Sequence, residues 1–441
     1  MTTLTLSPDA RHELKIFGAL AAAFATLYFL PVGQPRFDGA MTEALELTKW
    51  YAREHVVLCL LPAFWIAGAV AAFVSKSSVM RYLGPAAPKP LAYGVGSISG
   101  GILAVCSCTI LPLAAGIYRM GAGIGPATAF LYAGPAINVL AVIMTAKVLG
   151  AQLGAARAIG AIAFSIVIGL LMAFIFRNGE SERNAAAFAV PEDSSARPLW
   201  QTATFFGVMV GILVCANWGA ASQDTGFFAA VFSIKWPLTS LLALALALIL
   251  WRWFRVSLAR LLVVTAAVTL LAMALPHRPT WAFLAGVLGL AWLTAGRNDD
   301  AGEWFDQAWG YTKQIVPLLL GGVLIAGFLL GRPGHEGMIP SDWIAHLVGG
   351  NSLGANLFAA ISGALMYFAT LTEVPILQGL LGNGMGSGPA LTLLLAGPAL
   401  SLPSMIVINS ILGPRRTAVY VGLVVLMATF TGWLYSIWTT W

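Results

Sequence analysis

The chain has 441 residues, of which 59% are hydrophobic and only 10% are charged, whereas ordinary soluble domains carry roughly 25% charged residues. With a mean hydropathy of +0.83, this composition excludes a soluble globular protein. It predicts an all-α, polytopic integral membrane protein with about 10–13 transmembrane helices. The net charge of +6 is typical of basic membrane loops, so the lipid bilayer is an expected partner and nucleic acid is not.

Apolar segments long enough to cross a membrane recur along the whole chain. Their centres lie near residues 23, 65, 104, 137, 164, 210, 246, 266, 288, 322, 366, 399 and 427. The first segment, Ile16–Leu30, has no convincing cleavage site behind it, so we expect an uncleaved helix. The segments near 104, 137, 366 and 399 are interrupted by Gly and Pro, and we expect them to cross as broken helices or to fold back as hairpins.

One stretch of sequence occurs twice. Residues Ile98–Asn138 and Ile361–Ser401 lie 263 residues apart, and 16 of their 41 aligned positions are identical without a gap, most of them Gly, Pro or Ala. Proline removes a backbone donor and interrupts a helix, and in lipid the freed backbone groups must be satisfied by protein or by a watery cavity. Two such interruptions at matching places predict a central polar site built from both copies, as in many transporters.

The duplication divides the chain into two repeat halves. We expect half A at residues 1–178, with broken helices at about 91–149, and half B at 279–441, with broken helices at about 353–412. A polar linker at 179–199 and inserted transmembrane helices at 200–276 separate them. The number of helices between the halves favours a parallel arrangement, whereas the positions of the basic loops favour an inverted one. Both arrangements therefore stay open.

Each half also contains a segment rich in charge and tryptophan ahead of a matching Ile-Ala-Gly. These segments are Glu43–Arg53 and Glu303–Lys313. Amphipathic segments of this kind favour the membrane surface. We therefore expect both to lie in the interface plane.

Glu373 is the one acidic residue of eighteen that falls deep inside an apolar segment. A charge at bilayer depth costs at least about 2.5 kcal/mol, so it usually faces a partner or a cavity and serves a function. We predict that Glu373 carries a proton during transport, with Thr372 beside it lining the substrate path. A neutral glutamic acid that is hydrogen-bonded to a free helix carbonyl is the structural alternative.

Cys106, Ser107 and Cys108 lie at the matching interruption of half A. Thiolates select soft metals and metalloids, so the two cysteines are tentative metal ligands and all three residues are candidate substrate contacts. Residues i and i+2 of a regular helix point to different sides, so the two thiols converge only where the helix is broken. Packing as small buried hydrophobes is the alternative, and it is the expectation for Cys59 and Cys215. We expect no cofactor.

The interruptions share a pattern, Gly-Pro-Ala followed by Ala-Gly-Pro-Ala. Its glycines permit tight turns and close backbone approach, and it lacks the strand–turn–helix context of a nucleotide-binding loop. Asn138 and Ser401 follow the second Gly-Pro and are candidate lining groups. The predicted helix-break residues are Pro112, Gly125, Pro126, Gly134, Pro135, Pro375, Gly388, Pro389, Gly397 and Pro398.

These motifs resemble a known family. The runs CSCTILPLAAG and GAGIGPATAFLYAGPAIN in half A, with TEVP and GMGSGPALTLLLAGPALSLPS in half B, resemble the ArsP/YraQ-like predicted permeases, which include organoarsenical exporters. The resemblance implies a multi-pass permease of the inner (cytoplasmic) membrane that exports thiophilic species such as trivalent organoarsenicals. It carries over to Cys106, Cys108, Pro112, Glu373 and Pro375, and to the Gly-Pro-Ala runs. The inserted helices depart from the shorter exporters, so soft metals such as copper or zinc are alternative substrates.

No catalytic residue set and no P-loop stands in the sequence, so we expect a transporter rather than an enzyme. The leading hypothesis is a secondary transporter that binds a small-molecule or metalloid substrate between its halves and exchanges it for a proton at Glu373. A transmembrane thiol oxidoreductase that uses Cys106 and Cys108, and a passive channel, are the alternatives. The sequence leaves the transport direction, the coupling ion and the oligomeric state open.

Overall fold

The structure is a computed structural model, and its regular elements are helices in the part of the chain that it describes. Extended pairing there is limited to isolated bridges of Gly349 and Gly350 with Met385. The described residues are 17–18, 20–21, 24–25, 27–73, 82–84, 87–102, 107–137, 139–177, 198–218, 227–332, 335–340, 347–366, 373–382 and 384–439. Five of their helices are long and apolar enough to cross a membrane, and seven shorter apolar helices accompany them. The predicted all-α, polytopic membrane fold is confirmed.

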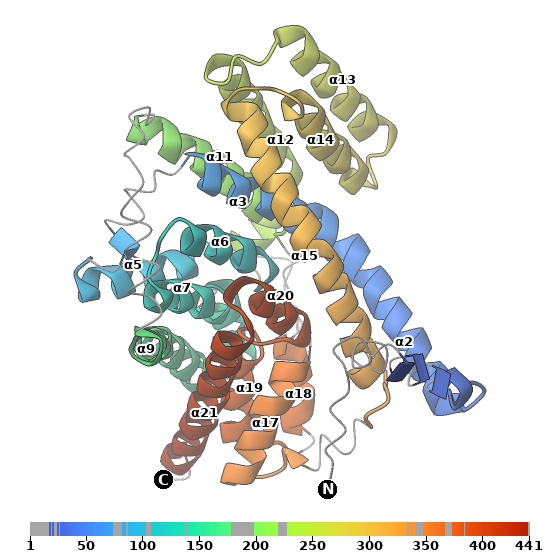
Figure 1. Cartoon of the computed structure of the whole chain (residues 1–441), viewed down its shortest axis with the longest axis vertical. Helices are drawn as coiled ribbons and strands as arrows, with labels where there is room; N and C mark the ends of the chain where they lie inside the picture. Colours follow the sequence, from blue (N-terminus) through green and yellow to red (C-terminus); the bar gives the residue numbers. More distant parts are fainter. Residues whose placement is uncertain are drawn as a thin grey trace, which may run out of the picture.

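Two long helical rods lie side by side across the molecule (Figure 1). The first joins three segments end to end, α2 (Pro35–Tyr51), the π-helix η1 (Ala52–Leu60) and α3 (Leu61–Phe73), and the second is α15 (Asp300–Leu330). Helix α15 packs along both α2 and α3. Small residues allow this close approach, because a Cβ added at Gly68 would lie 2.6 Å from the Ala308 nitrogen and one at Gly327 would lie 2.9 Å from the Ala44 Cα.

The two rods contain both of the segments that the sequence predicts for the membrane interface. Glu43–Arg53 and Glu303–Lys313 lie within the rods, and Trp304 is 0% exposed. Its indole N–H donates to the Trp65 carbonyl at 2.7 Å. A buried tryptophan whose N–H is satisfied is more stable in the core than at the surface, and charge content alone does not reveal that partner.

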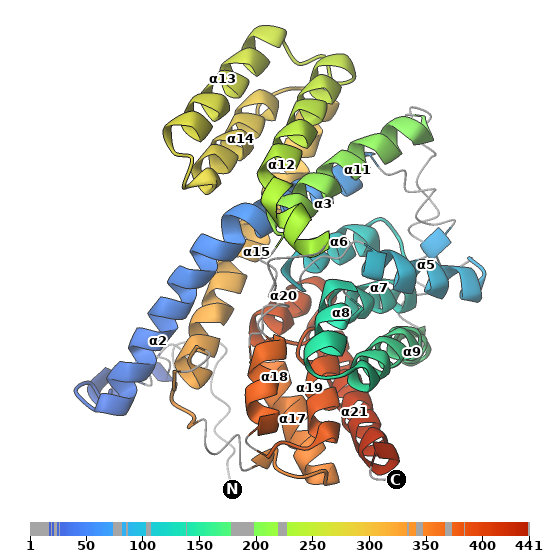
Figure 2. The same cartoon turned by 180° about the vertical axis from the view of Figure 1, so that it is seen from behind.

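In the described part of the chain, a set of five helices comes after each rod. The first five are α5 (Lys89–Ile102), α6 (Ser107–Arg119), α7 (Ile124–Ala136), α8 (Val139–Val148) and α9 (Ala151–Ile175). The second five are α17 (Leu353–Leu365), α18 (Glu373–Gly382), α19 (Ser387–Ala396), α20 (Leu402–Leu412) and α21 (Pro414–Thr439). Helices α19, α20 and α21 each begin 263 residues after α7, α8 and α9, the spacing that separates the two sequence copies. The two sets lie against each other in the lower part of the molecule (Figure 2).

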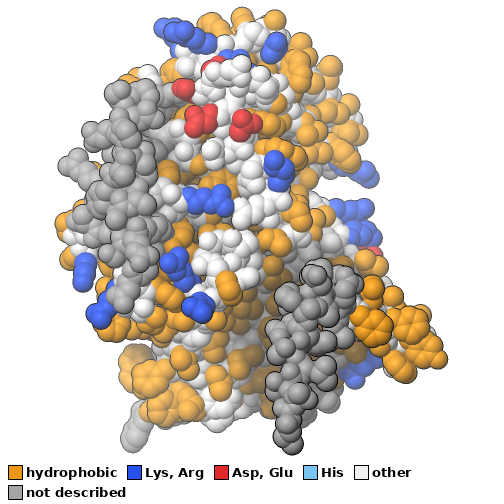
Figure 3. Space-filling view, viewed as in Figure 1, with side chains coloured by type: hydrophobic (Ala, Val, Ile, Leu, Met, Phe, Trp, Pro, Cys, Tyr) orange, Lys and Arg blue, Asp and Glu red, His pale blue; other side chains and the backbone are white. Residues whose placement is uncertain are grey.

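The remaining helices connect the two sets and form a lobe at one end (Figure 1). They are α11 (Leu199–Ala216), α12 (Phe227–Arg252), α13 (Leu258–Ala274) and α14 (Pro279–Thr294). Helix α14 packs on α13, so the lobe extends past the predicted insert. Hydrophobic side chains lie exposed on the lobe and on the lower body (Figure 3), as lipid-facing surfaces require.

Candidate functional site

Glu373 is the first residue of α18 and is 0% exposed. Helix α18 packs against α8 of the first set and α19 of its own set. The carboxylate therefore lies at a contact between the two helix sets, with its charge removed from water. Removing an ionised carboxylate from water is costly unless a partner compensates for the lost hydration.

The partner is Arg157 on α9, which is also 0% exposed. Its Nη2 lies 2.6 Å from Oε1 of Glu373, and its Nη1 donates a hydrogen bond to the Thr145 hydroxyl of α8 at 2.8 Å. The ion pair thus joins α9 to α18, and Thr145 ties the arginine to a third helix. Opposite charges at this distance in a low-dielectric interior attract strongly and stabilise each other's charged form.

The hydrogen-bond capacity of the site is incompletely used. Nε and Nη2 of Arg157, both carboxylate oxygens of Glu373 and the hydroxyl of Tyr420 are buried without a hydrogen-bond partner among the described residues. The 2.6 Å approach of Arg157 to Glu373 therefore brings the charges together without hydrogen-bond alignment, which needs a near-linear N–H···O angle. Unsatisfied buried polar groups are rare in proteins, so each of these groups calls for an explanation.

Sequence reasoning finds Glu373 but not Arg157. The available signal is that Arg157 is the single charged residue of α9, a 25-residue and otherwise apolar helix. An ionisable residue inside a membrane segment marks a functional site by default. Because Arg157 lies only seven positions into that helix, it resembles a basic residue that extends toward the interface.

The predicted thiol site lies largely beyond the described structure. Cys106, Asn138 and Thr372 are outside the described residues. Helix α6 begins at Ser107 and includes Cys108. The structure describes the backbone of these two residues but not their side chains. Within the described part of the chain, no group of three or more His, Cys, Asp or Glu residues is placed to hold a metal ion.

The other two cysteines, Cys59 and Cys215, are buried. Cys59 lies in the π-helix η1 and Cys215 near the end of α11. Their burial agrees with the packing role that the sequence predicts for them.

The prolines mark helix ends more often than breaks. Helix α6 runs on through Pro112 to Arg119, so the predicted break at Pro112 is wrong. Proline lacks the N–H that would bond the carbonyl four residues earlier, and here that carbonyl belongs to Cys108, in the first turn of the helix. Pro126, Pro375 and Pro389 each occupy the third position of a helix, where the N–H has no intrahelical partner in any case. Pro135 lies in the last turn of α7, and Pro398 follows the end of α19.

The predicted break glycines Gly125 and Gly388 are crossing points between helices. A Cβ added at Gly125 would lie 2.8 Å from the Gly169 carbonyl oxygen, so α7 and α9 meet backbone to backbone. A Cβ at Gly388 would lie 2.6 Å from the Gly432 carbonyl oxygen, at the crossing of α19 and α21. Close contact through small residues is the usual way in which membrane helices pack.

The remaining motif residues also serve packing and capping. A Cβ added at Gly134 would lie 2.6 Å from the Ile110 side chain, so α7 approaches α6 closely there. Gly397 directly follows α19, and a Cβ at Gly363 would lie 3.4 Å from its nitrogen. Ser401 is the N-cap of α20, because its hydroxyl accepts a hydrogen bond from the Ser404 backbone N–H at 3.3 Å while donating to the Ser404 hydroxyl at 2.7 Å. The capping bond satisfies a backbone N–H at the start of α20. The Ser401 hydroxyl, which the sequence suggests for substrate contact, is therefore already bonded within the protein.

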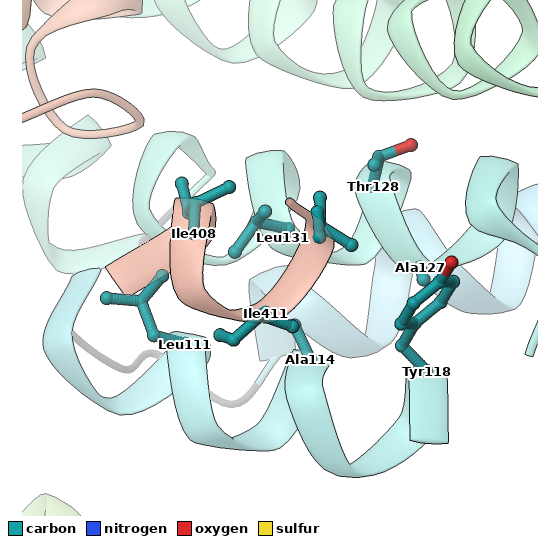
Figure 4. A pocket seen from close by; sticks show the side chains of 9 residues that line it. Leu111, Ala114, Tyr118, Ala127, Thr128, Leu131, Ile408 and Ile411 are labelled. Carbon is teal, nitrogen blue, oxygen red and sulfur yellow. The ribbon is translucent and has the colours of Figure 1, made fainter. Parts of the chain in front are cut away.

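A small apolar cavity lies between the two helix sets (Figure 4). It has a volume of about 10 Å³, which is room for about one water molecule. Side chains of α6, α7 and α20 line it, among them Leu111, Ala114, Leu131 and Ile408. The cavity lies where α20 packs on the first set, and its lining residues Leu111 and Ile408 are each only 1% exposed.

Comparison with known proteins agrees with this architecture. The chain matches the ArsP_1 family model, described as a predicted permease, over residues 40–437. It is 39% identical over 391 residues to UPF0718 protein MJ0584 of Methanocaldococcus jannaschii, covering 88% of this chain and 93% of that protein. It is 44% identical over 59 residues to UPF0718 protein YraQ of Escherichia coli, covering 13% of this chain and 17% of that protein. No solved structure matches it. The chain therefore belongs to the ArsP_1 family of predicted permeases and is a multi-pass membrane protein.

Proposed function

We propose that this permease is a secondary transporter of the inner (cytoplasmic) membrane that exports a thiophilic metalloid or metal species in exchange for protons. The observation that carries the proposal is the buried Arg157–Glu373 pair, which joins the two helix sets at 2.6 Å. Intramembrane carboxylates are costly to keep, and in transporters they commonly carry protons or ions.

The proton step follows from the electrostatics of the pair. While Glu373 is ionised, Arg157 offsets its charge, and the pair holds α9 and α18 together. Protonation makes Glu373 neutral and removes most of the attraction, so the helices are freer to separate. A carboxyl group that alternates between these two states carries one proton across with each cycle.

The substrate class rests on the cysteines and on the family. Cys108 is the second residue of α6, and Cys106 comes two residues earlier in the sequence. Thiolates prefer soft centres over hard cations. The resemblance to organoarsenical exporters favours trivalent organoarsenicals as the first substrates to test. Copper and zinc are the alternatives.

Transport in everted membrane vesicles tests the proposal. We expect vesicles with the wild-type protein to take up trivalent methylarsenite when a proton gradient, acid inside, is applied. Uptake is lost in Cys106→Ser/Cys108→Ser, while Glu373→Gln loses uptake against a gradient. Cys59→Ala/Cys215→Ala is the matched control, because it removes the other two thiols and keeps uptake. No uptake by the wild type rejects the arsenical and directs the test to copper and zinc. Uptake that is unchanged in Glu373→Gln contradicts proton coupling.

A further inference from the structure

Two membrane-spanning helices bring arginine residues together at one end. Helices α9 and α21 are long and apolar enough to cross a membrane, and they pack on each other. Arg177 comes two residues after the end of α9, while Arg415 and Arg416 lie in the first turn of α21. The guanidinium carbon of Arg416 lies 5.8 Å from the centre of the Phe176 ring. The end of α9 therefore meets the start of α21.

A fourth arginine, at the end of α6, joins this group. Arg416 donates a hydrogen bond to the hydroxyl of Tyr118, and the residue after Tyr118 is Arg119. Arg119 donates in turn to Oε1 of Gln314 on α15 at 2.8 Å. The Gln314 amide reaches the Ser410 hydroxyl, near the end of α20, at 3.5 Å. These contacts define one arginine cluster, which consists of Arg119, Arg177, Arg415 and Arg416.

The arginine cluster lies at a boundary of the apolar body. Helices α6, α9 and α20 end there, and α21 begins there. In α15, the uncharged run 315–330 follows Lys313 and Gln314. Lysine and arginine side chains gather over this part of the molecule on the face drawn in Figure 3. Helix ends at which apolar sequence gives way to basic residues are typical of the level of the lipid headgroups.

The positive charge of the cluster is not offset within the described segments that form it. Arg119, Arg177 and Arg415 are exposed, and they form no ion pair in the described part of the chain. The dipole of α21 opposes the two arginines in its first turn, because a helix N-terminus is itself positive. No Asp or Glu occurs in the segments that meet at the cluster, residues 116–123, 174–177, 310–314 and 409–417.

The opposite ends of the two spanning helices are uncharged. Helix α9 begins within the run 150–154 and α21 ends within the run 434–439, and neither run contains a charged residue. An excess of arginine at one end of membrane helices is typical of the cytoplasmic face. The lipid leaflet on that face is rich in anionic headgroups. The charge asymmetry therefore favours an anionic lipid as the partner of the cluster.

We propose that the arginine cluster is a binding surface for the phosphate headgroups of anionic phospholipids. A guanidinium presents a planar fork of N–H donors that matches phosphate oxygens, and basic sites between membrane helices are typical places for such headgroups. A headgroup bound there contacts the ends of α6, α9 and α21 together and offsets their mutual repulsion. The inference concerns the surrounding lipid rather than the transported species, so it does not depend on the proposed function.

Photocrosslinking of lipid to the full-length protein in phosphatidylcholine nanodiscs tests the proposal. A phosphatidylglycerol analogue with a photoreactive headgroup is added at rising mole fraction, and mass spectrometry maps the crosslinks. We expect saturable crosslinking within residues 116–123 and 409–417, with little at 150–154 and 434–439. Arg415→Gln raises the half-saturating mole fraction about fivefold, as the loss of one cationic side chain beside anionic lipid predicts. Arg415→Lys keeps the charge and stays close to the wild type.

Two controls separate the cluster from general charge and from free anions. Arg278→Gln removes an exposed arginine from the loop between α13 and α14, so it leaves the half-saturating fraction unchanged. Excess inorganic phosphate leaves the lipid crosslinks in place. Their loss in phosphate assigns the cluster to a soluble anion and overturns the lipid assignment. Equal crosslinking at both ends of α9 and α21, or an unchanged half-saturating fraction in Arg415→Gln, also overturns the proposal.

Discussion

The Thr145 hydroxyl accepts a hydrogen bond from Nη1 of Arg157 and at the same time donates to the Ala141 carbonyl of its own helix. A buried hydroxyl that accepts and donates in this way fixes the guanidinium in one orientation. Thr145 thereby links α8 to the only ion pair of the described structure in which both side chains are 0% exposed. The position of Arg157 depends on this contact as well as on Glu373.

Thr145→Val removes that acceptor at nearly constant volume. We expect a loss of about 1–3 kcal/mol of stability, because another buried N–H of Arg157 is left unsatisfied. Thr128→Val is the control, since the Thr128 hydroxyl bonds only carbonyls of its own helix and its loss strands no charged donor. Thermal unfolding in lipid nanodiscs measures both, and equal shifts would show that Thr145 does not support the arginine.

Removing one charge of the buried pair is more damaging than removing both. Arg157→Gln leaves Glu373 without compensation, and breaking a buried pair in this way typically costs about 3–5 kcal/mol. Arg157→Gln/Glu373→Gln removes the remaining charge, so we expect it to recover most of that loss. Unfolding by SDS titration compares the variants, and additive losses in the double variant would contradict the coupling of the two residues.

Gly432 and Gly422 lie on the same helix, α21, but in different surroundings. A Cβ at Gly432 would collide with Gly388, Thr392 and Asn356, whereas a Cβ at Gly422 meets nothing within 4 Å. We expect Gly432→Ala to destabilise the protein by about 1–3 kcal/mol through overpacking, and Gly422→Ala to be neutral. The unfolding midpoints of the two alanine variants decide the point; a stable Gly432→Ala protein would mean that the α19–α21 crossing can widen.

Trp304 joins the lobe to the body of the molecule. Its ring lies among Phe73, Phe205 and Phe254, with centroid distances of 5.2–6.0 Å. We expect Trp304→Ala to cost about 3–5 kcal/mol, as is usual for a buried tryptophan. Trp309→Ala on the same helix is the control, since Trp309 is 48% exposed. Similar losses in the two variants, measured by intrinsic fluorescence during unfolding, would argue against a packed junction.

Asp299 is the N-cap of α15, accepting a hydrogen bond from the Gly302 nitrogen. The hydrogen bond from Arg297 holds the pKa of this carboxyl below its usual range. A lowered pKa in the folded state gives stability that is present at neutral pH and is lost as the pH falls through that lowered pKa, below about pH 4. We expect Asp299→Ala to lose about 1 kcal/mol at pH 7, whereas Asp299→Asn keeps the cap but not the charge. Unfolding at pH 7 and pH 3 separates the two contributions, and the difference between Asp299→Asn and the wild type should shrink at pH 3.

The fold class and the family follow from the sequence because composition and long ordered motifs encode them. An apolar chain of this length has few options in a membrane. Glu373 is identified for the same reason, since an acidic residue stands out in an apolar segment. The division into two halves stays a prediction, supported by the common helix spacing.

No local pattern in the sequence predicts which distant helices contact each other. Arg157 and Glu373 meet because α9 and α18 converge, and no short pattern specifies that convergence. The break predicted at Pro112 is wrong because α6 continues through this sixth residue to Arg119, although the proline gives up one backbone hydrogen bond, the one to the Cys108 carbonyl. The sequence suggests helix breaks at the Gly-Pro runs, whereas Gly125 and Gly388 lie where two helices cross. A one-dimensional pattern cannot separate the glycines of a crossing from those of a turn.

The length of α15 has a mechanical consequence. Its 31 residues extend over roughly 46 Å at about 1.5 Å per residue, whereas the hydrocarbon layer is about 30 Å thick. Such a helix must tilt or protrude, and the antiparallel rod of α2, η1 and α3 has to incline with it. The angle of this pair then depends on bilayer thickness. Because both helix sets are attached to the pair, lipid chain length becomes a variable that can bias the balance between the two sides of the permease.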